Sequence, residues 1–185
     1  MQWMIPGTVI PVSEAESANL EEKMRSMFLA GGIMLGQICT ATGLEPYTVQ
    51  NRVKRGFLKP PVQKRYDLKQ FCRILNINML KDALIMEDIV GLMQYINGDL
   101  EDESDDLIDD PQLYFLFVKL QANCAKGHSS KDVERYLQQI LADYQEPKPG
   151  AKERVKKVLQ TMHIAWGAVQ LKRLAQNMVK NLKEA

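Results

Sequence analysis

Apolar residues recur at every third or fourth position along most of the chain, which is the spacing expected of helices with one buried face. The pattern predicts an all-α protein. Its longer helices are expected at residues 17–29, 67–75, 80–96, 111–125, 130–144 and 152–182. Two shorter helices are expected between residues 35 and 55. Residues 3–12 are apolar but contain two prolines, so no element is predicted there.

The two short helices are predicted to form a helix-turn-helix pair. Their apolar positions form one small core, made of Leu35, Ile38, Cys39, Leu44, Val49 and Val53. Gly43 falls where the first helix ends and the chain needs a left-handed residue, a conformation that glycine adopts without steric cost. Pro46 suits the first turn of the second helix because its fixed φ is already helical. That helix is predicted from Pro46 to Arg55, with Gly56 ending it.

The outer face of the second helix carries side chains that suit DNA. With the two valines turned inward, the residues expected to face out are Tyr47, Thr48, Gln50, Asn51, Arg52 and Lys54. Gln and Asn can form paired hydrogen bonds with the N6 and N7 edge of adenine, and Arg or Lys can contact guanine or phosphate. A tight helix pair can present such a face to the DNA major groove. An ordinary solvated helix has a similar composition, so both interpretations stay open.

Positive charge is concentrated around the end of this helix. Residues 52–73 contain eight basic residues and one acid, Asp67, whereas the net charge of the whole chain is +1. The basic residues are Arg52, Lys54, Arg55, Lys59, Lys64, Arg65, Lys69 and Arg73. Neutralising phosphates releases counterions, which is the main term in non-specific DNA binding. A local basic patch is sufficient for this and favours the DNA interpretation.

The order of these motifs resembles the winged helix-turn-helix head of MerR-type transcription regulators. The resemblance rests on the Thr42-Gly43-Leu44 turn, a helix beginning near Thr48, the Gly56-Phe57-Leu58-Lys59-Pro60 segment and the Arg65-Tyr66 pair. It is closest to an uncharacterised bacterial family known only as a domain of unknown function, and it covers residues 33–97. Two features depart from the MerR pattern. Gln50, Asn51 and Arg52 stand where an Arg and two aromatics are usual, and no glycine turn precedes Arg65.

The resemblance implies a DNA-binding transcription regulator whose β wing is very short. The base-reading residues would be Tyr47, Gln50, Asn51 and Lys54. The phosphate contacts would come from Thr48, Arg52 and Arg55, and from the wing residues Lys59, Lys64, Arg65 and Tyr66. A helix from Asp67 to Leu75 would support the wing. Operators with two half-sites are read by two-fold dimers, so the expected partners are double-stranded DNA and a second copy of the chain.

Four segments are predicted along the chain. They are an N-terminal extension with one helix over residues 1–32, the helix-turn-helix head over 33–98, an acidic loop over 99–110 and a C-terminal helical bundle over 111–185. The loop holds eight acids in twelve residues and no base, which is typical of a solvated, mobile segment. It lacks the glycine and the twelfth-position Glu of an EF-hand loop, so calcium is not predicted.

Candidate chemistry outside the head is sparse. Cys39, Cys72 and Cys124 lack CxxC spacing and are expected in the core, so neither a disulfide nor a metal site is predicted. His128 and His163 have no nucleophile at readable spacing, and no glycine-rich phosphate loop is present, so no enzyme and no cofactor are expected. The sequence has neither an apolar run of about 18 residues nor a signal-peptide pattern. A cytoplasmic protein without membrane contact is therefore expected.

The last predicted helix, from Lys152 to Leu182, is about 45 Å long at about 1.5 Å per residue. Its apolar stripe consists of Val155, Val158, Leu159, Met162, Trp166, Val169, Leu174, Met178 and Leu182. A stripe of this length favours packing across a second subunit, in a homodimer, although it can also cover the two preceding helices. Two functions therefore stay open: a DNA-binding regulator, with or without a small-molecule effector, and a non-catalytic protein-interaction module that uses the C-terminal helices.

Overall fold

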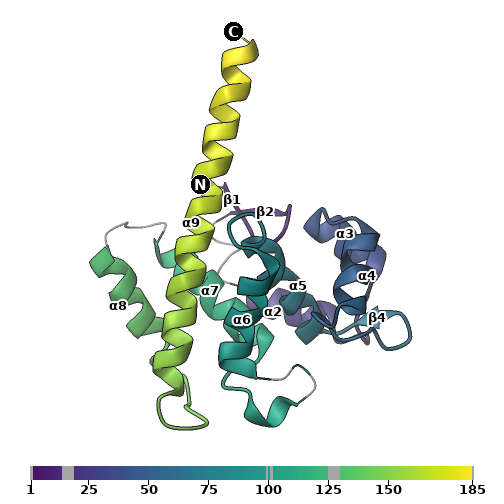
Figure 1. Cartoon of the computed structure of the whole chain (residues 1–185), viewed down its shortest axis with the longest axis vertical. Coiled ribbons are helices and arrows are strands. Elements are labelled where there is room, and N and C mark those ends of the chain that lie inside the picture. Colours follow the sequence, from purple (N-terminus) through teal and green to yellow (C-terminus); the bar gives the residue numbers. More distant parts are fainter. Residues whose placement is uncertain (1, 14–18, 99, 101, 125–129, 185) are drawn as a thin grey trace.

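The computed structural model describes residues 2–13, 19–98, 100, 102–124 and 130–184. Its elements are β1 (Gln2–Met4), β2 (Pro11–Ser13), α2 (Leu20–Met27), β3 (Ile33–Met34), α3 (Leu35–Thr42), α4 (Pro46–Lys54), β4 (Arg65–Tyr66), α5 (Leu68–Leu80), α6 (Met86–Asn97), the short 3-10 helix η1 (Glu103–Asp105), α7 (Asp110–Cys124), α8 (Ser130–Ile140) and α9 (Ala151–Glu184) (Figure 1). The prediction of an all-α protein that ends in a long helix is confirmed. Some residues named in the sequence predictions lie outside the described ranges: Ser17, Asp99, Glu101, Ala125 and His128.

Helix α5 lies at the centre of the core. Ten of its thirteen residues are buried, and it packs against α3, α7 and α9. Its N-terminus is fixed by a capping box: the Gln70 N–H donates to Asp67 Oδ1 at 2.7 Å, and the Asp67 N–H donates to Gln70 Oε1 at 2.9 Å. Helix α7 supplies the facing wall, where Leu113, Tyr114 and Phe117 have no exposed surface. Asp67 is therefore the N-cap of α5, at the start of the helix predicted from residue 67.

The predicted helix boundaries differ most from the structure between residues 75 and 86. Helix α5 continues past Leu75 to Leu80, because Ile77 and Leu80 extend its buried face. The next helix therefore begins at Met86 and not at Leu80. Ile85, which lies within the helix predicted over residues 80–96, is instead the exposed residue just before α6.

The N-terminal segment forms a β-hairpin that the sequence pattern did not predict. Strands β1 and β2 pair antiparallel. The turn between them is tied to the core, because Tyr114 Oη donates a hydrogen bond to the Pro6 carbonyl and Asn78 Nδ2 donates one to the Gly7 carbonyl, both at 2.8 Å. Gly7 has φ +77°, and a Cβ there would lie 2.6 Å from the Leu75 carbonyl oxygen. Only glycine fits this close approach to α5.

The acidic segment after α6 is anchored at its C-terminal end. Leu107 and Ile108 are buried, and the Tyr144 hydroxyl donates a hydrogen bond to the Leu107 carbonyl. Asp109 Oδ1 accepts a hydrogen bond from the Gln112 N–H at the start of α7. The expectation of a solvated loop is therefore wrong for residues 107–110, because two apolar side chains hold this part of the run in the core.

Helix α9 has a packed part and a projecting part. Up to Val169 it buries an apolar stripe, and it packs against α5, α6 and α7. From Gln170 to Lys183 every residue is exposed, and Figure 1 shows this end extending beyond the rest of the protein. The predicted continuous stripe from Val155 to Leu182 is thus interrupted: its last members do not pack within the described part of the chain.

The three cysteines are free thiols. Cys72 and Cys124 are buried, as expected of core residues, and burial raises the pKa of both thiols. Cys39 is half-buried. Within the described ranges no three His, Cys, Asp or Glu side chains are grouped so that they could hold a metal ion.

No helix in the described ranges combines the length and the apolar character that crossing a membrane requires.

Candidate nucleic-acid interface

Helices α3 and α4 form a helix-turn-helix pair with a small core of its own. Ile38 from α3 and Val49 from α4 have no exposed surface. The Thr42 hydroxyl closes the turn, since it donates to the Ile38 carbonyl at 2.7 Å and accepts from the Leu44 N–H at 3.2 Å. Gly43 follows α3 with φ +69°, the left-handed cap predicted from the sequence. The pair is therefore held by local contacts between residues close in sequence.

The C-terminus of α4 is fixed by a second glycine. The helix ends at Lys54, one residue earlier than predicted. The Gly56 N–H donates to the Val53 carbonyl at 3.0 Å, and the Phe57 N–H donates to the Arg52 carbonyl at 2.9 Å. These two bonds form a Schellman cap, and Gly56, with φ +72°, supplies its left-handed residue. The cap turns the chain away from the helix axis and starts the segment that leads to the wing.

All four residues predicted to read bases are exposed on α4. Tyr47, Gln50, Asn51 and Lys54 occupy positions i, i+3, i+4 and i+7, so they share one helical face. None of the four side chains has a hydrogen bond to another residue of the described chain. Their donors and acceptors are therefore free to bind a partner molecule. Thr48, predicted to contact phosphate, is half-buried beside this face.

The expectation that Arg52 faces outward is wrong. Its side chain is only 4% exposed, because position 52 lies three residues after Val49 and shares the inward face of the helix. Its Nε and Nη1 atoms have no hydrogen-bond partner in the described structure, and burial lowers the pKa of Arg52 to about 10. Arg52 is thus an unpaired buried cation, and its position does not support the predicted phosphate contact.

A tight β-hairpin turn forms the wing. Val62 and Arg65 exchange both backbone hydrogen bonds, with N···O distances of 3.0 and 2.9 Å. The two residues between them, Gln63 and Lys64, have φ of 50° and 64°. A two-residue turn with both φ values positive is the type I′ pattern, which normally uses Asn and Gly. Here two long polar residues hold this conformation, and Lys64 is exposed at its tip.

The strand that follows the turn places two predicted phosphate ligands, Arg65 and Tyr66, on opposite faces. Strand β4 pairs with β3, with Tyr66 opposite Ile33. Because successive side chains of a strand point to opposite faces, Arg65 is exposed and Tyr66 is only 3% exposed. Arg65 Nη1 donates a hydrogen bond to the Gly32 carbonyl at 2.9 Å. Burial raises the pKa of Tyr66. Tyr66 is therefore a core residue under the wing, and the predicted phosphate contact is wrong.

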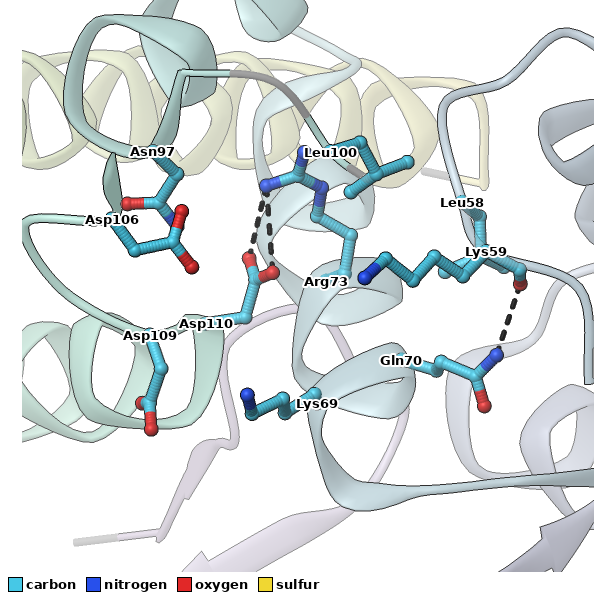
Figure 2. Close-up of a pocket in the computed structure, with 10 residues that line it drawn as sticks. All are labelled: Leu58, Lys59, Lys69, Gln70, Arg73, Asn97, Leu100, Asp106, Asp109 and Asp110. Carbon is cyan, nitrogen blue, oxygen red and sulfur yellow. Dashed lines mark hydrogen bonds and ion pairs between the residues drawn. The ribbon is translucent and has the colours of Figure 1, made fainter. Parts of the chain in front are cut away.

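Behind the wing, the basic residues of α5 meet the acidic segment (Figure 2). Arg73 Nη1 lies 3.3 Å from Asp110 Oδ1, and both side chains are almost fully buried. Asn76 Nδ2 also donates to Asp110 Oδ1, at 3.3 Å. Burial raises the pKa of Asp110, and the charge of Arg73 opposes that rise. Arg73 is therefore a structural cation and not part of a DNA-binding patch.

A pocket beside the Arg73–Asp110 ion pair also contains residues from the base of the wing. Lys59 and Lys69 line it together with Asp106 and Asp109 (Figure 2). Gln70 Nε2 donates to the carbonyls of Lys59 and Pro60, at 3.0 and 2.8 Å. α5 thus holds the segment that leads into the wing. The predicted phosphate ligand Lys59 is half-buried and lies among acids.

The exposed surface therefore carries fewer of the basic residues than the sequence alone suggests. Of the phosphate ligands predicted from the sequence, Arg55, Lys64 and Arg65 are exposed. The Arg55 guanidinium stacks on the Phe57 ring at 4.8 Å and lies 3.9 Å from the exposed Glu87 carboxylate. Figure 1 shows α3, α4 and β4 together at one end of the protein, away from α8. The Gln63-Lys64 turn is not predicted from the sequence, because neither residue type is usual in a turn with two positive φ values.

Residues 35–117 match the model of a protein family described as Domain of unknown function (DUF1836). The matched segment runs from the first residue of α3 into α7, so it includes the helix pair, the wing, the Arg73–Asp110 ion pair and the acidic segment. This agrees with the expected similarity to a family of unknown function. No curated protein matches the chain. No solved structure matches it.

Proposed function

We propose that the protein binds double-stranded DNA and acts as a transcription regulator, with α4 in the major groove and the Gln63-Lys64 turn on the phosphate backbone. The observation that carries the proposal is the exposed face of Tyr47, Gln50, Asn51 and Lys54 on a short, capped helix. A rigid helix pair of this kind can present its second helix to the groove. The similarity of the Gly56 to Tyr66 segment to MerR-type heads supports the same function.

The chemistry of the face fits duplex DNA. Asn51 and Gln50 carry amides that can pair with the N6 and N7 edge of adenine, while Lys54 can reach guanine or a phosphate. Arg55, Lys64 and Arg65 are the exposed cations available for phosphate contacts. Arg52 and Tyr66 have no part in this proposal because both are buried.

The strained turn is a second support. A non-glycine residue in the left-handed region costs roughly 1–2 kcal/mol. Gln63 and Lys64 both adopt that region, and such strain is concentrated at functional sites. A lysine at this position places a cation at the outermost point of the wing, where a glycine would be more stable but uncharged.

Two glycine variants of the turn test the proposal. Binding to random-sequence duplex DNA is measured by fluorescence anisotropy at several salt concentrations. Lys64→Gly is expected to flatten the salt dependence by about one unit of slope, because one phosphate contact is lost. Gln63→Gly should leave the slope unchanged. Both variants should be more stable than the wild type by about 1 kcal/mol, because glycine relieves the left-handed strain.

Lys157→Ala is the control for the loss of any exposed lysine, since Lys157 lies on α9, outside the helix pair and the wing. It should bind as the wild type does. Equal binding by the wild type and Lys64→Gly would disprove the wing contact. Absence of salt-dependent binding by the wild type would disprove the DNA function as a whole.

A non-catalytic protein-interaction module is the second candidate. The observation that favours it is the exposed apolar surface at the end of α9, which includes Leu171, Met178 and Leu182. Exposed patches of this kind mark protein contact sites. The anisotropy titration separates the two candidates, because a module of this class without a DNA-binding role would show no affinity for duplex DNA.

A further inference from the structure

One side of helix α9 faces the rest of the protein, which we call the body. The contacts on this side end near residue 173. The side chains that pack on the body are Val155, Val158, Leu159, Met162, Ala165, Trp166 and Val169. One turn later the same side carries Lys172 and Arg173. Lys172 Nζ lies 3.5 Å from the Asp82 carbonyl oxygen, and Arg173 Nη2 lies 3.9 Å from the Asp82 carboxylate. Beyond these contacts the helix continues for about three more turns.

The opposite side of α9 carries a second apolar stripe, which we call the 164–182 stripe. Its members are Ile164, Ala168, Leu171, Ala175, Met178 and Leu182, all of them exposed. The large ones are 72%, 69%, 60% and 79% exposed for Ile164, Leu171, Met178 and Leu182 respectively. The spacing of four, three, four, three and four residues is a heptad repeat, the pattern of a coiled-coil seam. Lys157 and Thr161 precede the stripe on this side and make its start polar.

The two stripes lie on opposite sides of the helix. At about 100° per residue, their mean directions differ by roughly 160°. A partner on the 164–182 stripe therefore does not compete with the body of the same chain. Since most of a helix's stability in proteins comes from tertiary packing, the exposed end from Leu174 to Lys183, beyond the contacts with Asp82, indicates a further partner.

The composition of the stripe identifies that partner. We propose that α9 pairs with α9 of a second copy of this chain, in an antiparallel coiled coil centred near Arg173. A two-fold axis at this point sets Ile164 against Leu182, Ala168 against Met178, and Leu171 against Ala175. Each of these contacts then occurs twice, once from each copy, as an isologous interface requires. Every alanine faces a large side chain, so the layers fill evenly.

A parallel pair fits the same stripe less well. It would set Ala168 against Ala168 and Ala175 against Ala175, with Leu171 against Leu171 between them. Two helices at a fixed separation cannot suit layers of two alanines and of two leucines at once, so cavities would remain. The charged side chains near the centre of the pair leave the stripe free in either orientation. Lys172 and Arg173 are directed to Asp82 of their own chain, and Lys180 lies on the side away from the stripe.

The first test is the mass of the full-length protein in solution, measured by sedimentation equilibrium without DNA. The wild type is expected at twice the 21.1 kDa of one chain. Leu171→Glu combined with Met178→Glu should weaken dimerisation by at least about a hundredfold, because it places charges in the seam. The matched control, Gln170→Glu combined with Asn177→Glu, adds the same charges one residue earlier and should remain dimeric.

A monomeric wild type overturns the proposal, and so does a control that dissociates as much as the seam variant. Both α9 variants change only residues that are exposed in a single chain, so circular dichroism should show the helix content of the wild type. The measurement contains no DNA. Failure of the dimer therefore leaves the DNA-binding proposal to its own test.

The second test is the direction of pairing. A nitroxide label at Lys183→Cys, in a chain carrying Cys39→Ser, lies ten residues from the centre of the pair. In the antiparallel register the two labels are separated along the axis by roughly 30 Å, at about 1.5 Å per residue. In a parallel pair they lie side by side. An electron–electron distance in the shorter range overturns the antiparallel register even if the protein is dimeric.

Discussion

Helices α4 and α5 lie one after the other in the chain but use their surfaces in opposite ways. In α4, two of nine residues are buried, Val49 and Arg52. In α5, ten of thirteen are buried. α4 is held by its C-terminal cap and by one narrow apolar contact, whereas α5 is held from several sides by α3, α7 and α9. The difference shows that a short helix with one narrow apolar contact can leave most of its surface exposed.

The buried arginines of the two helices differ in the same way. On α5 the buried Arg73 has a carboxylate partner, and the buried Gln70 binds two backbone carbonyls. On α4 the buried Arg52 leaves two nitrogen atoms without a partner, and the exposed polar side chains bind nothing in the described chain. We infer that the buried cation of α5 is paired while that of α4 is not, and the following variants test this contrast in order of decreasing effect on stability.

Arg73→Met is expected to have the largest effect. It leaves the buried Asp110 carboxylate without its cation, which costs about 3–5 kcal/mol of unfolding free energy at neutral pH. Without Arg73, desolvation raises the pKa of Asp110 further. An acid whose pKa is raised in the folded state destabilises that state above its unfolded pKa, about 3.9. The loss should therefore shrink as the pH falls toward that value, which urea unfolding at several pH values can measure.

The control for this pair is the double variant Arg73→Met with Asp110→Asn. Asparagine keeps the shape that Asn76 binds but carries no charge, so much of the lost stability should return at neutral pH. A single variant as stable as the wild type at neutral pH would show that the ion pair contributes nothing to α5, and the contrast with α4 would fail.

Arg52→Met is expected to have the opposite sign. Methionine fills a similar volume without leaving buried N–H groups unpaired, so the unfolding free energy should rise by about 1–2 kcal/mol. Because burial lowers the pKa of Arg52 to about 10, the gain should decrease as the pH rises through that value and the wild-type side chain becomes neutral. Lys54→Met on the exposed face of α4 is the comparison and should change stability by less than about 0.5 kcal/mol. Destabilisation by Arg52→Met would mean that the guanidinium has a partner in solution.

Much of the fold was readable from the sequence because its signals are local. Gly43, Pro46 and Asp67 mark the helix ends by their own backbone and capping chemistry. The apolar periodicity of α7 and α9 is likewise visible within each segment. The N-terminal hairpin was missed because it depends on distant partners: Tyr114 binds the Pro6 carbonyl from 108 residues away.

The sequence predicts the candidate site only in part, because basic residues that are close in the sequence do not all lie in one exposed patch. Arg73 belongs to the basic run of residues 52–73, but its partner Asp110 lies 37 residues further along the chain. The prediction turns only the two valines inward and so leaves Arg52 on the outer face, although its position relative to Val49 puts it inward. The left-handed Gln63-Lys64 turn follows from the closure of the hairpin at Val62 and Arg65, which neither residue type indicates.

Asn51→Ala should have the smallest effect on folding and a specific effect on binding. Asn51 is exposed on α4 and has no hydrogen bond within the described chain, so the unfolding free energy should change by less than about 0.5 kcal/mol. If α4 reads the major groove, loss of the paired amide contact should relax the preference at one base position by roughly 1–3 kcal/mol. Selection of bound duplexes from a random library, with the wild type and the variant in parallel, measures this directly. A uniform loss across all positions would instead assign Asn51 to the phosphate backbone, and no change at all would place the reading surface outside α4.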